Sequence, residues 1–470
     1  MLFSSLVFLF VFLPIVLIIY FSLRGSMRNY FLLLASLIFY AWGEPKFVFV
    51  MIASITANYV FGVLLGRRKS KSILVLSMAV NIGILFIFKY LNFAVSNIDH
   101  IFNDLIPQTS IELPIGISFF TFQAMAYVID VYRGNVRCQR NPFYLGLYIS
   151  LFPQLIAGPI VRYSDIEEQI ENRTITFDSF GEGVRRFLIG FSKKVLIANN
   201  MAVVADWAFG AYSEGTLTVS AAWLGAICYT LQIYFDFGGY SDMAIGLGKM
   251  FGFYYRENFN YPYLSKSATE FWRRWHMSLG SWFRDYVYIP MGGSRVSGGR
   301  HIFNLFAVWA LTGMWHGANW TFIVWGLLYF VLLTFEKKTG LDKTGKSRVA
   351  EAIKHVYAML FVVLGWVIFR AETLGTGIGY IGTMFGLTGA AAYSPITLFY
   401  LHENWVFIAF AVIYSTSLFK KIRDGIADGG GQAGETILTL GGTLVYLALF
   451  IVSVSYLVIG SYNPFIYFNF

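Results

Sequence analysis

Two histidines stand in tryptophan-rich, apolar segments of this chain, forty positions apart. His276 ends the run WRRWH at 272–276, and His316 lies in the run WHG at 315–317. An ionisable side chain in a membrane is costly, and it is kept mainly where it lines a cavity or takes part in chemistry. Because histidine exchanges its proton near neutral pH, the pair predicts proton transfer inside a membrane-embedded tunnel.

The distance of His316 from His301 predicts how deep it lies. Fifteen residues, or about 22 Å of helix, separate it from His301, which we expect near the cytoplasmic surface. Since the hydrocarbon layer is ~30 Å thick, His316 should stop inside the membrane. Gly313 and Gly317 permit a bend or a close approach there, and irregular backbone at that depth needs a surrounding cavity. This pattern favours a functional histidine over a hydrogen-bonded core histidine.

The composition is that of a membrane protein. Of 470 residues, 57% are hydrophobic and 13% charged, whereas soluble domains carry about a quarter charged residues. Lipid must therefore cover much of the surface. The 47 Phe, 30 Tyr and 12 Trp residues suit interfacial belts and a rigid lining for a substrate path. The net charge is +9, and the basic residues lie between the apolar runs. This pattern is typical of the cytoplasmic loops of a membrane protein and not of a nucleic-acid-binding surface.

Apolar runs predict an all-α polytopic protein with about eleven transmembrane helices plus re-entrant or interfacial helices, in a single domain over residues 1–470. The first run is expected to be a retained span, because no basic residue precedes it and no small-residue cleavage site follows. The runs are 2–23, 30–42, 47–65, 73–92, 113–131, 143–160, 184–205, 218–235, 240–253, 302–335, 355–369, 404–419 and 436–460.

Basic loops orient the expected spans. Arg24 with Arg28, and the cluster at 67–71, flank one helical pair whose own turn is 43–46. Both basic loops would be cytoplasmic, which places the N-terminus outside the cytoplasm. The arginines at 133–140 then return the chain to the cytoplasmic side.

The stretch 254–301 is basic, aromatic and amphipathic. Two interpretations stay open: an anchor among lipid headgroups, or a cytoplasmic mouth that receives an anionic donor. Its seven basic residues are Arg256, Lys266, Arg273, Arg274, Arg284, Arg295 and Arg300, against the acidic Glu257, Glu270 and Asp285.

The remaining polar residues do not indicate a second site. The two histidines lack acidic partners three or four positions away, so no metal ligand set is expected, and no phosphate loop or nucleophile elbow occurs. Asp236 and Asp242 are expected to flank a turn at a span end, where helix capping or arginine pairing is favoured over acid–base work. Four further histidines are expected near the surface: His100, His301, His355 and His402.

Six segments, in order along nearly the whole chain, carry a family resemblance. They are 152–160, 234–242, 257–263, 269–293, 312–325 and 369–372. Together they resemble the membrane-bound O-acyltransferase (MBOAT) superfamily and, within it, the alginate O-acetyltransferase membrane-subunit (AlgI-like) group. Gly238 departs from the family pattern, which has Ser there, and the change is expected to affect packing rather than chemistry.

The resemblance implies a fold and two catalytic residues. In this fold a ring of helices surrounds a thin central region, where a cytoplasmic and an extracytoplasmic funnel meet in a tunnel. His316 matches the family's membrane histidine, the expected general base. His276 matches a second polar position that is Asn, Asp or His in different branches.

Acyl transfer from a thioester to a hydroxyl needs the hydroxyl to lose its proton as it attacks, and a positioned imidazole contributes roughly 10²–10⁴-fold to such a step. His276 is expected to hydrogen-bond the thioester carbonyl or the developing oxyanion. Guanidinium groups of the basic stretch would meet donor phosphates, although Arg284 and Asp285 fit internal ion pairs equally well. The residues expected to bind the donor or line its path are Trp272, Arg273, Arg274, Trp275, Arg284, Asp285, Trp315 and Asn319.

We therefore expect a bacterial inner-membrane O-acetyltransferase that takes acetyl from a cytoplasmic thioester, with acetyl-CoA as co-substrate and no cofactor. It would serve O-acetylation of an exported polysaccharide such as alginate. The family implies an extracytoplasmic SGNH-type acetyltransferase as partner, and an acyl carrier protein is a further candidate. Two alternatives stay open: D-alanyl transfer to teichoic acid from a carrier-protein thioester, and a proton-coupled transporter or flippase that uses the histidines as a relay.

Overall fold

All regular structure that the computed structural model describes is helical. It describes residues 1–102, 107, 109–343, 345, 347–460 and 462–466, and within these ranges no residue is in a strand. The expectation of an all-α fold is confirmed.

The chain divides into two compact units, which are described separately. Unit 1 consists of Met1–Phe187, Met243–Arg256 and Arg284–Tyr286. Unit 2 consists of Leu188–Asp242, Glu257–Phe283 and Val287–Phe470. Both candidate catalytic histidines belong to unit 2, and a single domain over 1–470 stays a prediction.

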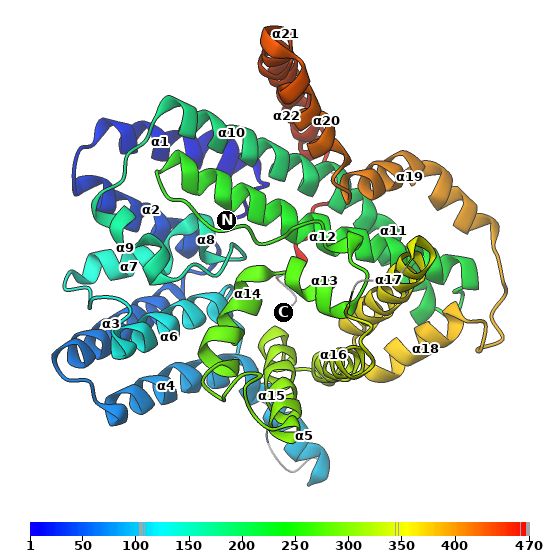
Figure 1. The fold of residues 1–470 in the computed structure, drawn as a ribbon, viewed down its shortest axis with the longest axis horizontal. Helices are drawn as coiled ribbons and strands as arrows, with labels where there is room; N and C mark the ends of the chain where they lie inside the picture. The colour runs from blue at the N-terminus through cyan, green and yellow to red at the C-terminus, as the bar shows by residue number, and fades with distance from the viewer. Residues whose placement is uncertain (103–106, 108, 344, 346, 461, 467–470) are drawn as a thin grey trace. The chain divides into compact units, whose positions relative to one another are not determined.

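Unit 1 is built from helices of the first part of the chain (Figure 1). These are η1 (Phe8–Phe12), α1 (Leu13–Ser22), α2 (Met27–Gly43), α3 (Val48–Arg67), α4 (Lys71–Leu85), η2 (Phe86–Tyr90), α5 (Leu91–Ile101), α6 (Ile117–Arg133), α7 (Pro142–Ser150), α8 (Phe152–Leu155) and α9 (Tyr163–Glu171). Helix α3 packs closely on α6, because a Cβ at Gly62 would lie 2.6 Å from the Tyr127 hydroxyl. Buried amides of Asn58 and Asn81 bond each other at 2.8 and 3.0 Å between α3 and α4, as polar side chains do between membrane helices.

Unit 2 contains the remaining helices, with α10 (Phe177–Ser192) and α12 (Val219–Met250) contributing to both units. The others are η3 (Lys193–Ala198), α11 (Asn199–Ser213), η4 (Pro262–Leu264), α13 (Ala268–Arg274), α14 (Met277–Phe283), α15 (Gly298–His316), α16 (Trp320–Thr339), α17 (Arg348–Arg370), α18 (Leu374–Met384), α19 (Pro395–Tyr414), α20 (Leu418–Gly429), α21 (Gly431–Thr436), η6 (Ile437–Gly441) and α22 (Gly442–Val458); η5 (Arg284–Tyr288) is divided between the units.

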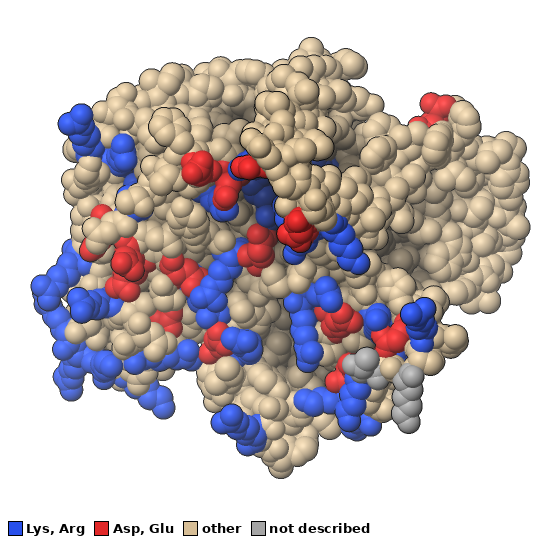
Figure 2. Space-filling view, turned by 45° about the horizontal axis from the view of Figure 1, so that its top comes forward, with Lys and Arg blue, Asp and Glu red and all other residues tan. Residues whose placement is uncertain are grey.

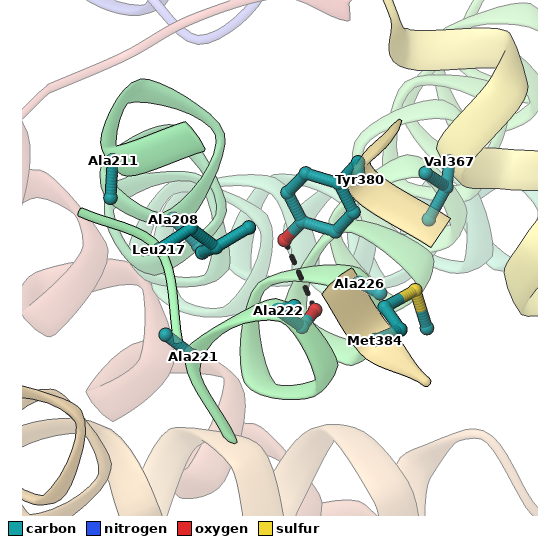
Figure 3. Packing of buried hydrophobic residues seen from close by; sticks show 9 residues of the cluster. All are labelled: Ala208, Ala211, Leu217, Ala221, Ala222, Ala226, Val367, Tyr380 and Met384. Atoms are coloured by element: carbon teal, nitrogen blue, oxygen red, sulfur yellow. Dashed lines mark hydrogen bonds between the residues drawn. The ribbon is translucent and has the colours of Figure 1, made fainter. Parts of the chain in front are cut away.

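Small residues let the helices of unit 2 approach one another. Figure 3 shows alanines of α11 and α12 packed with Val367 of α17 and with Tyr380 and Met384 of α18. The Tyr380 hydroxyl donates to the Ala222 carbonyl at 3.0 Å. A Cβ at Gly225 would lie 2.3 Å from that of Ala208. This packing of small side chains is typical of membrane helices.

The prediction of a span-end turn between Asp236 and Asp242 is wrong. Helix α12 runs without interruption through both residues and joins the apolar runs 218–235 and 240–253. Lys194 contacts the Asp236 carboxylate at 2.8 Å, and Lys193 contacts Asp242 at 2.6 Å. Because each carboxylate is neutralised by a lysine, a charged residue can remain inside an apolar helix. The partners are lysines rather than the arginines or helix caps that we expected.

Two further apolar runs are interrupted. The run 302–335 forms two helices, α15 and α16, and the run 143–160 breaks at Leu151 between α7 and α8. The basic stretch 254–301 is also discontinuous: it holds the seven-residue helices α13 and α14 between irregular segments. It is therefore not one long amphipathic helix.

Seven helices among the described residues are long and apolar enough to cross a membrane. They are Val48–Arg67, Lys71–Ile101, Phe177–Ser213, Trp320–Thr339, Arg348–Arg370, Pro395–Tyr414 and Gly431–Val458, with Phe8–Ser22 a shorter apolar helix. Figure 2 shows charged side chains gathered on part of one face, beside broad surface with neither acid nor base. These features fit a multi-pass membrane protein, and the count of about eleven spans stays a prediction.

Candidate active site

A buried carboxylate fixes the helix that leads to His276. Glu336 of α16 is fully buried and accepts hydrogen bonds from the backbone N–H groups of Ala268 and Thr269, at 2.6 and 2.8 Å. The Thr269 hydroxyl donates to the same carboxylate at 2.6 Å. These N–H groups lie in the first turn of α13 and have no partner within the helix, and the positive end of the helix dipole favours a carboxylate there. Glu336 thereby ties α13 to α16.

His276 lies in a strained turn between α13 and α14. Its φ is +44°, a left-handed conformation that among the described non-glycine residues occurs elsewhere at Tyr261. Such a conformation costs of order 1–3 kcal/mol and persists where the surroundings enforce it. Here Asn258 does so, because its carbonyl accepts from Met277 N at 2.9 Å and its side-chain Oδ1 accepts from Ser278 N at 3.2 Å. The segment around Asn258 therefore clamps the turn.

The His276 ring is buried between a hydrogen-bonded edge and aromatic faces. Its Nδ1 lies 3.2 Å from Asn258 Oδ1, and its ring centroid lies 4.7 Å from that of Phe237 and 5.8 Å from that of Trp315. The residue is 1% exposed and lies outside the seven candidate spans. Burial lowers the pKa of His276 to about 3, so the ring is neutral at physiological pH.

His316 is held by aromatic rings at the end of a helix. It is the last residue of α15 and is buried, with ring centroids of Trp315, Trp325 and Phe369 at 5.0, 5.0 and 5.2 Å. The carbonyl end of a helix favours a positive charge, which suits a group that accepts a proton. His301 lies in the same unbroken helix, so about 22 Å of helix separates the two residues, as expected, and the depth of His316 in the membrane stays a prediction.

Glycines bring α15 and α16 together at this point. A Cβ at Gly313 would lie 2.5 Å from the Phe322 carbonyl, and one at Gly326 would lie 2.5 Å from the Trp309 carbonyl. A Cβ at Gly317 would meet the Phe322 ring at 2.2 Å. The expected close approach around His316 is therefore present, with a break in the helix at Gly317.

The Trp315 indole contacts both histidines, so the structure brings His276 and His316 to one aromatic side chain. The other expected wall residues are also in this cluster. Trp272 packs on Trp325 at 5.3 Å, and Trp275, which is 2% exposed, packs on Trp366 at 4.9 Å. The tryptophans of the two sequence runs thus share one aromatic cluster around the histidine pair.

The expected donor-binding polar residues have varied surroundings. Arg273 is exposed on α13. Arg274 pairs with Glu270 at 2.8 Å and also donates to the Asn260 carbonyl. Asn319 caps α16 by accepting from Thr321 N at 3.1 Å, and it donates to the Glu372 carbonyl at 2.9 Å. The contacts of Arg274 and Asn319 are structural.

Arg284 and Asp285 belong to unit 1. Asp285 contacts Arg162 and Arg284 at 2.7 Å each, and its backbone carbonyl accepts from Arg133 at 3.1 Å. Of the two roles expected for Arg284 and Asp285, donor binding or internal ion pairing, this arrangement fits internal ion pairing. Burial raises the pKa of Asp285, but hydrogen bonds from Arg284 and Arg162 outweigh it and lower that pKa below its usual value.

Three contributors to the site were not identified from sequence. Asn258, Glu336 and Phe369 have no catalytic signature of their own, since each acts through a neighbour in space. Asn258 and Phe369 do lie in segments that carried the family resemblance, which was the available signal. Glu336 lies outside those segments, and nothing in the sequence marked it.

The other histidines lie at partly or fully exposed positions, as expected for His100, His301, His355 and His402. Among the residues described, no three His, Cys, Asp or Glu side chains gather in a group that could hold a metal ion.

Comparisons with known proteins give the family. Residues 139–341 match the model of the "MBOAT, membrane-bound O-acyltransferase family". The chain is 42% identical to "Probable alginate O-acetylase AlgI" of Pseudomonas putida over the whole of both chains. It is 34% identical to "Peptidoglycan O-acetyltransferase" of Helicobacter pylori, over 89% of this chain and 87% of that one. "Teichoic acid D-alanyltransferase" of Bacillus subtilis matches at 29% over 55% of this chain and 69% of its own length. The chain therefore belongs to the membrane-bound O-acyltransferase family, in its AlgI-like group, and is a multi-pass membrane O-acetyltransferase.

Proposed function

We propose that this protein moves an acetyl group from a cytoplasmic thioester, acetyl-CoA, towards an exported polysaccharide, with His316 as general base. The observation that carries the proposal is the burial of His316 and His276 against one indole, that of Trp315. Both histidines fall within the segment that matches the acyltransferase family. Buried titratable groups of this kind concentrate at functional sites.

The reaction balances without a cofactor. A hydroxyl oxygen attacks the thioester carbonyl carbon while its proton passes to the His316 imidazole. The carbon–sulfur bond then breaks, the departing thiolate takes the proton from the imidazolium, and an ester and a free thiol result. The carbonyl end of α15 favours the transient positive charge on His316, and a positioned base contributes roughly 10²–10⁴-fold to such a step.

The acceptor is proposed to be a hydroxyl of an exported polysaccharide, because the AlgI relatives are named for alginate and the Helicobacter relative is named for peptidoglycan. An extracytoplasmic SGNH-type acetyltransferase would complete the transfer. Arg273, exposed on α13, is the strongest remaining candidate for the donor phosphates, because Arg256, Arg274 and Arg284 of the same stretch pair with carboxylates. We propose that the protein lies in the bacterial inner membrane with its N-terminus outside the cytoplasm.

The test is acetyl transfer in inverted membrane vesicles supplied with radiolabelled acetyl-CoA and the extracytoplasmic partner. We expect label on the partner or glycan with wild-type protein and none with His316→Ala at equal protein level. The matched control is His402→Ala, since His402 is exposed on α19, and it should retain wild-type transfer. Equal transfer by His316→Ala would overturn the role of His316.

Two outcomes would favour the alternatives. Transfer from a D-alanyl carrier-protein thioester but not from acetyl-CoA would favour D-alanyl transfer to teichoic acid, the reaction for which two less similar relatives are named. A function that needs a proton gradient and no acyl donor would favour a transporter, in which the histidines relay protons.

A further inference from the structure

The turn at His276 is held by Asn258, a residue to which the sequence analysis assigned no role. Asn258 is 1% exposed, and its Oδ1 accepts from Ser278 N at 3.2 Å and from Ser278 Oγ at 2.9 Å and lies 3.2 Å from His276 Nδ1. Its backbone carbonyl also accepts from Met277 N at 2.9 Å. His276 and the two residues that follow it, Met277 and Ser278, are thus all held by this one asparagine.

The backbone bond determines which way the Asn258 amide points. A backbone N–H is always a donor, so the amide atom that faces Ser278 N must be the oxygen. Turning the amide over would place its NH₂ group against this N–H, and two donors would face each other inside the protein. A buried donor without an acceptor costs of order 1–3 kcal/mol, so the oxygen faces the histidine.

The position of the oxygen then determines the His276 tautomer. A neutral imidazole carries one proton, and the nitrogen that faces an acceptor must hold it. If Nδ1 carried no proton, its lone pair would face that of Asn258 Oδ1 at 3.2 Å. The Ser278 hydroxyl lies closer to Oδ1, at 2.9 Å, than to Nδ1, at 3.5 Å. The proton therefore belongs on Nδ1.

We infer that Asn258 is a positioning residue that holds His276 as the Nδ1–H tautomer, so that Nε2 accepts a hydrogen bond from a hydroxyl or amide N–H of the bound substrates. This inference rests on the proposed function for its catalytic meaning. It replaces the donor role expected from sequence, because a neutral ring cannot also donate from Nε2 to a thioester carbonyl. A low pKa, set by burial, removes the doubly protonated form in which both nitrogens donate.

The first measurement is the tautomer itself, in wild-type protein that need not turn over. Protein with ¹⁵N-labelled histidine in lipid nanodiscs gives ring nitrogen signals, and the His276 signal is the one absent from the spectrum of His276→Gln. We expect a neutral ring protonated on Nδ1. A ring protonated on Nε2 would overturn the inference, whatever the activity of the protein.

The second measurement is acetyl-transfer kinetics of two substitutions at one position. Asn258→Leu keeps the approximate shape but removes the acceptor, and we expect kcat to fall about 10²-fold with little change in KM, as for the loss of a partner that orients a functional histidine. Asn258→Asp keeps an acceptor oxygen for Nδ1 and for Ser278 N, and it should restore kcat to within about fivefold of wild type, by the same logic of an orienting carboxylate. Wild-type kcat in Asn258→Leu would overturn the inference.

The matched control is another buried asparagine of unit 2. Asn304 is fully buried and donates to the Met291 and Gly293 carbonyls at 3.2 and 3.0 Å. Asn304→Leu should lower the unfolding temperature but leave kcat per folded molecule near wild type. An equal loss of kcat in Asn304→Leu and Asn258→Leu, without rescue by Asn258→Asp, would show that the effect is general loss of packing. Absence of acetyl transfer in wild type would instead refute the proposed function and leave the tautomer measurement standing.

Discussion

His276 and His316 are both buried against Trp315 but are held in different ways. Polar contacts hold one side of His276: its backbone is left-handed, Asn258 bonds the two residues that follow it, and Nδ1 lies 3.2 Å from Asn258 Oδ1. His316 ends a regular helix, and its described ring contacts are aromatic. Hydrogen bonds fix the protonation of a ring, whereas aromatic contacts fix its position. The comparison suggests that His276 orients a substrate and that His316 exchanges the proton.

Substitution of His316 should have the largest effect. Removing the group that takes the proton should lower kcat about 10³-fold or more, within the range of general-base catalysis, while His316→Ala keeps its fold because the surrounding rings remain packed. Acetyl transfer normalised to folded protein tests this. Residual activity above that of His276→Ala would reverse the roles assigned to the two histidines.

Substitution of His276 should have a smaller effect. Loss of an orienting hydrogen bond should reduce kcat about 100-fold, at least as much as Asn258→Leu does, which leaves measurable activity in His276→Ala. The double variant sharpens the comparison. If both residues serve one step, His276→Ala with His316→Ala should be no slower than His316→Ala alone, because effects of residues that act as a unit are not additive. Independent losses that multiply would separate the two roles.

The anchor of α13 should affect stability more than chemistry. Glu336→Gln replaces one acceptor oxygen with a donor that faces backbone N–H groups, and it should destabilise the protein by about 1–3 kcal/mol. A thiol-reactive dye can follow unfolding, because Cys228 is buried. The control is Glu351→Gln. Glu351 forms a more exposed ion pair with Lys266, so its substitution should change the unfolding temperature little. An unchanged unfolding temperature in Glu336→Gln would show that α13 is held by its tryptophans instead.

Substitution of Asp285, which pairs with Arg162 and Arg284 in unit 1, should have the smallest effect, and its effect on stability should depend on pH. Since the folded state lowers the pKa of Asp285, the stabilisation is complete above the usual value of 3.8 and is lost as the pH falls through the lower, folded-state pKa. Asp285→Asn should therefore lower the unfolding temperature at pH 7, and its difference from wild type should shrink in acid. A difference that does not vary with pH would mean that packing, and not charge, stabilises this pair. Acetyl transfer should change little at either pH.

The sequence indicated the site through residue type. The structure added the contacts between residues that are far apart in the chain. His276, His316 and the tryptophans beside them were marked by ionisable or aromatic side chains in apolar runs. Asn258 was not, because an asparagine in a loop has many ordinary uses, and its partner is eighteen positions away. Asp236 and Asp242 were misplaced for a related reason: charges in an apolar run suggest its end, unless lysines of another helix neutralise them.

The sequence by itself determined the all-helical membrane class and singled out the pair of histidines, because hydrophobic runs and residue chemistry are local properties. The family came from the resemblance of six segments. The tertiary structure decided which side chains meet. It brought both histidines to Trp315, buried Glu336 at the start of α13, and set Asn258 against Nδ1 of His276. These outcomes depend on the packing of helices far apart in the chain, and a protonation state depends on the one atom that the ring nitrogen faces.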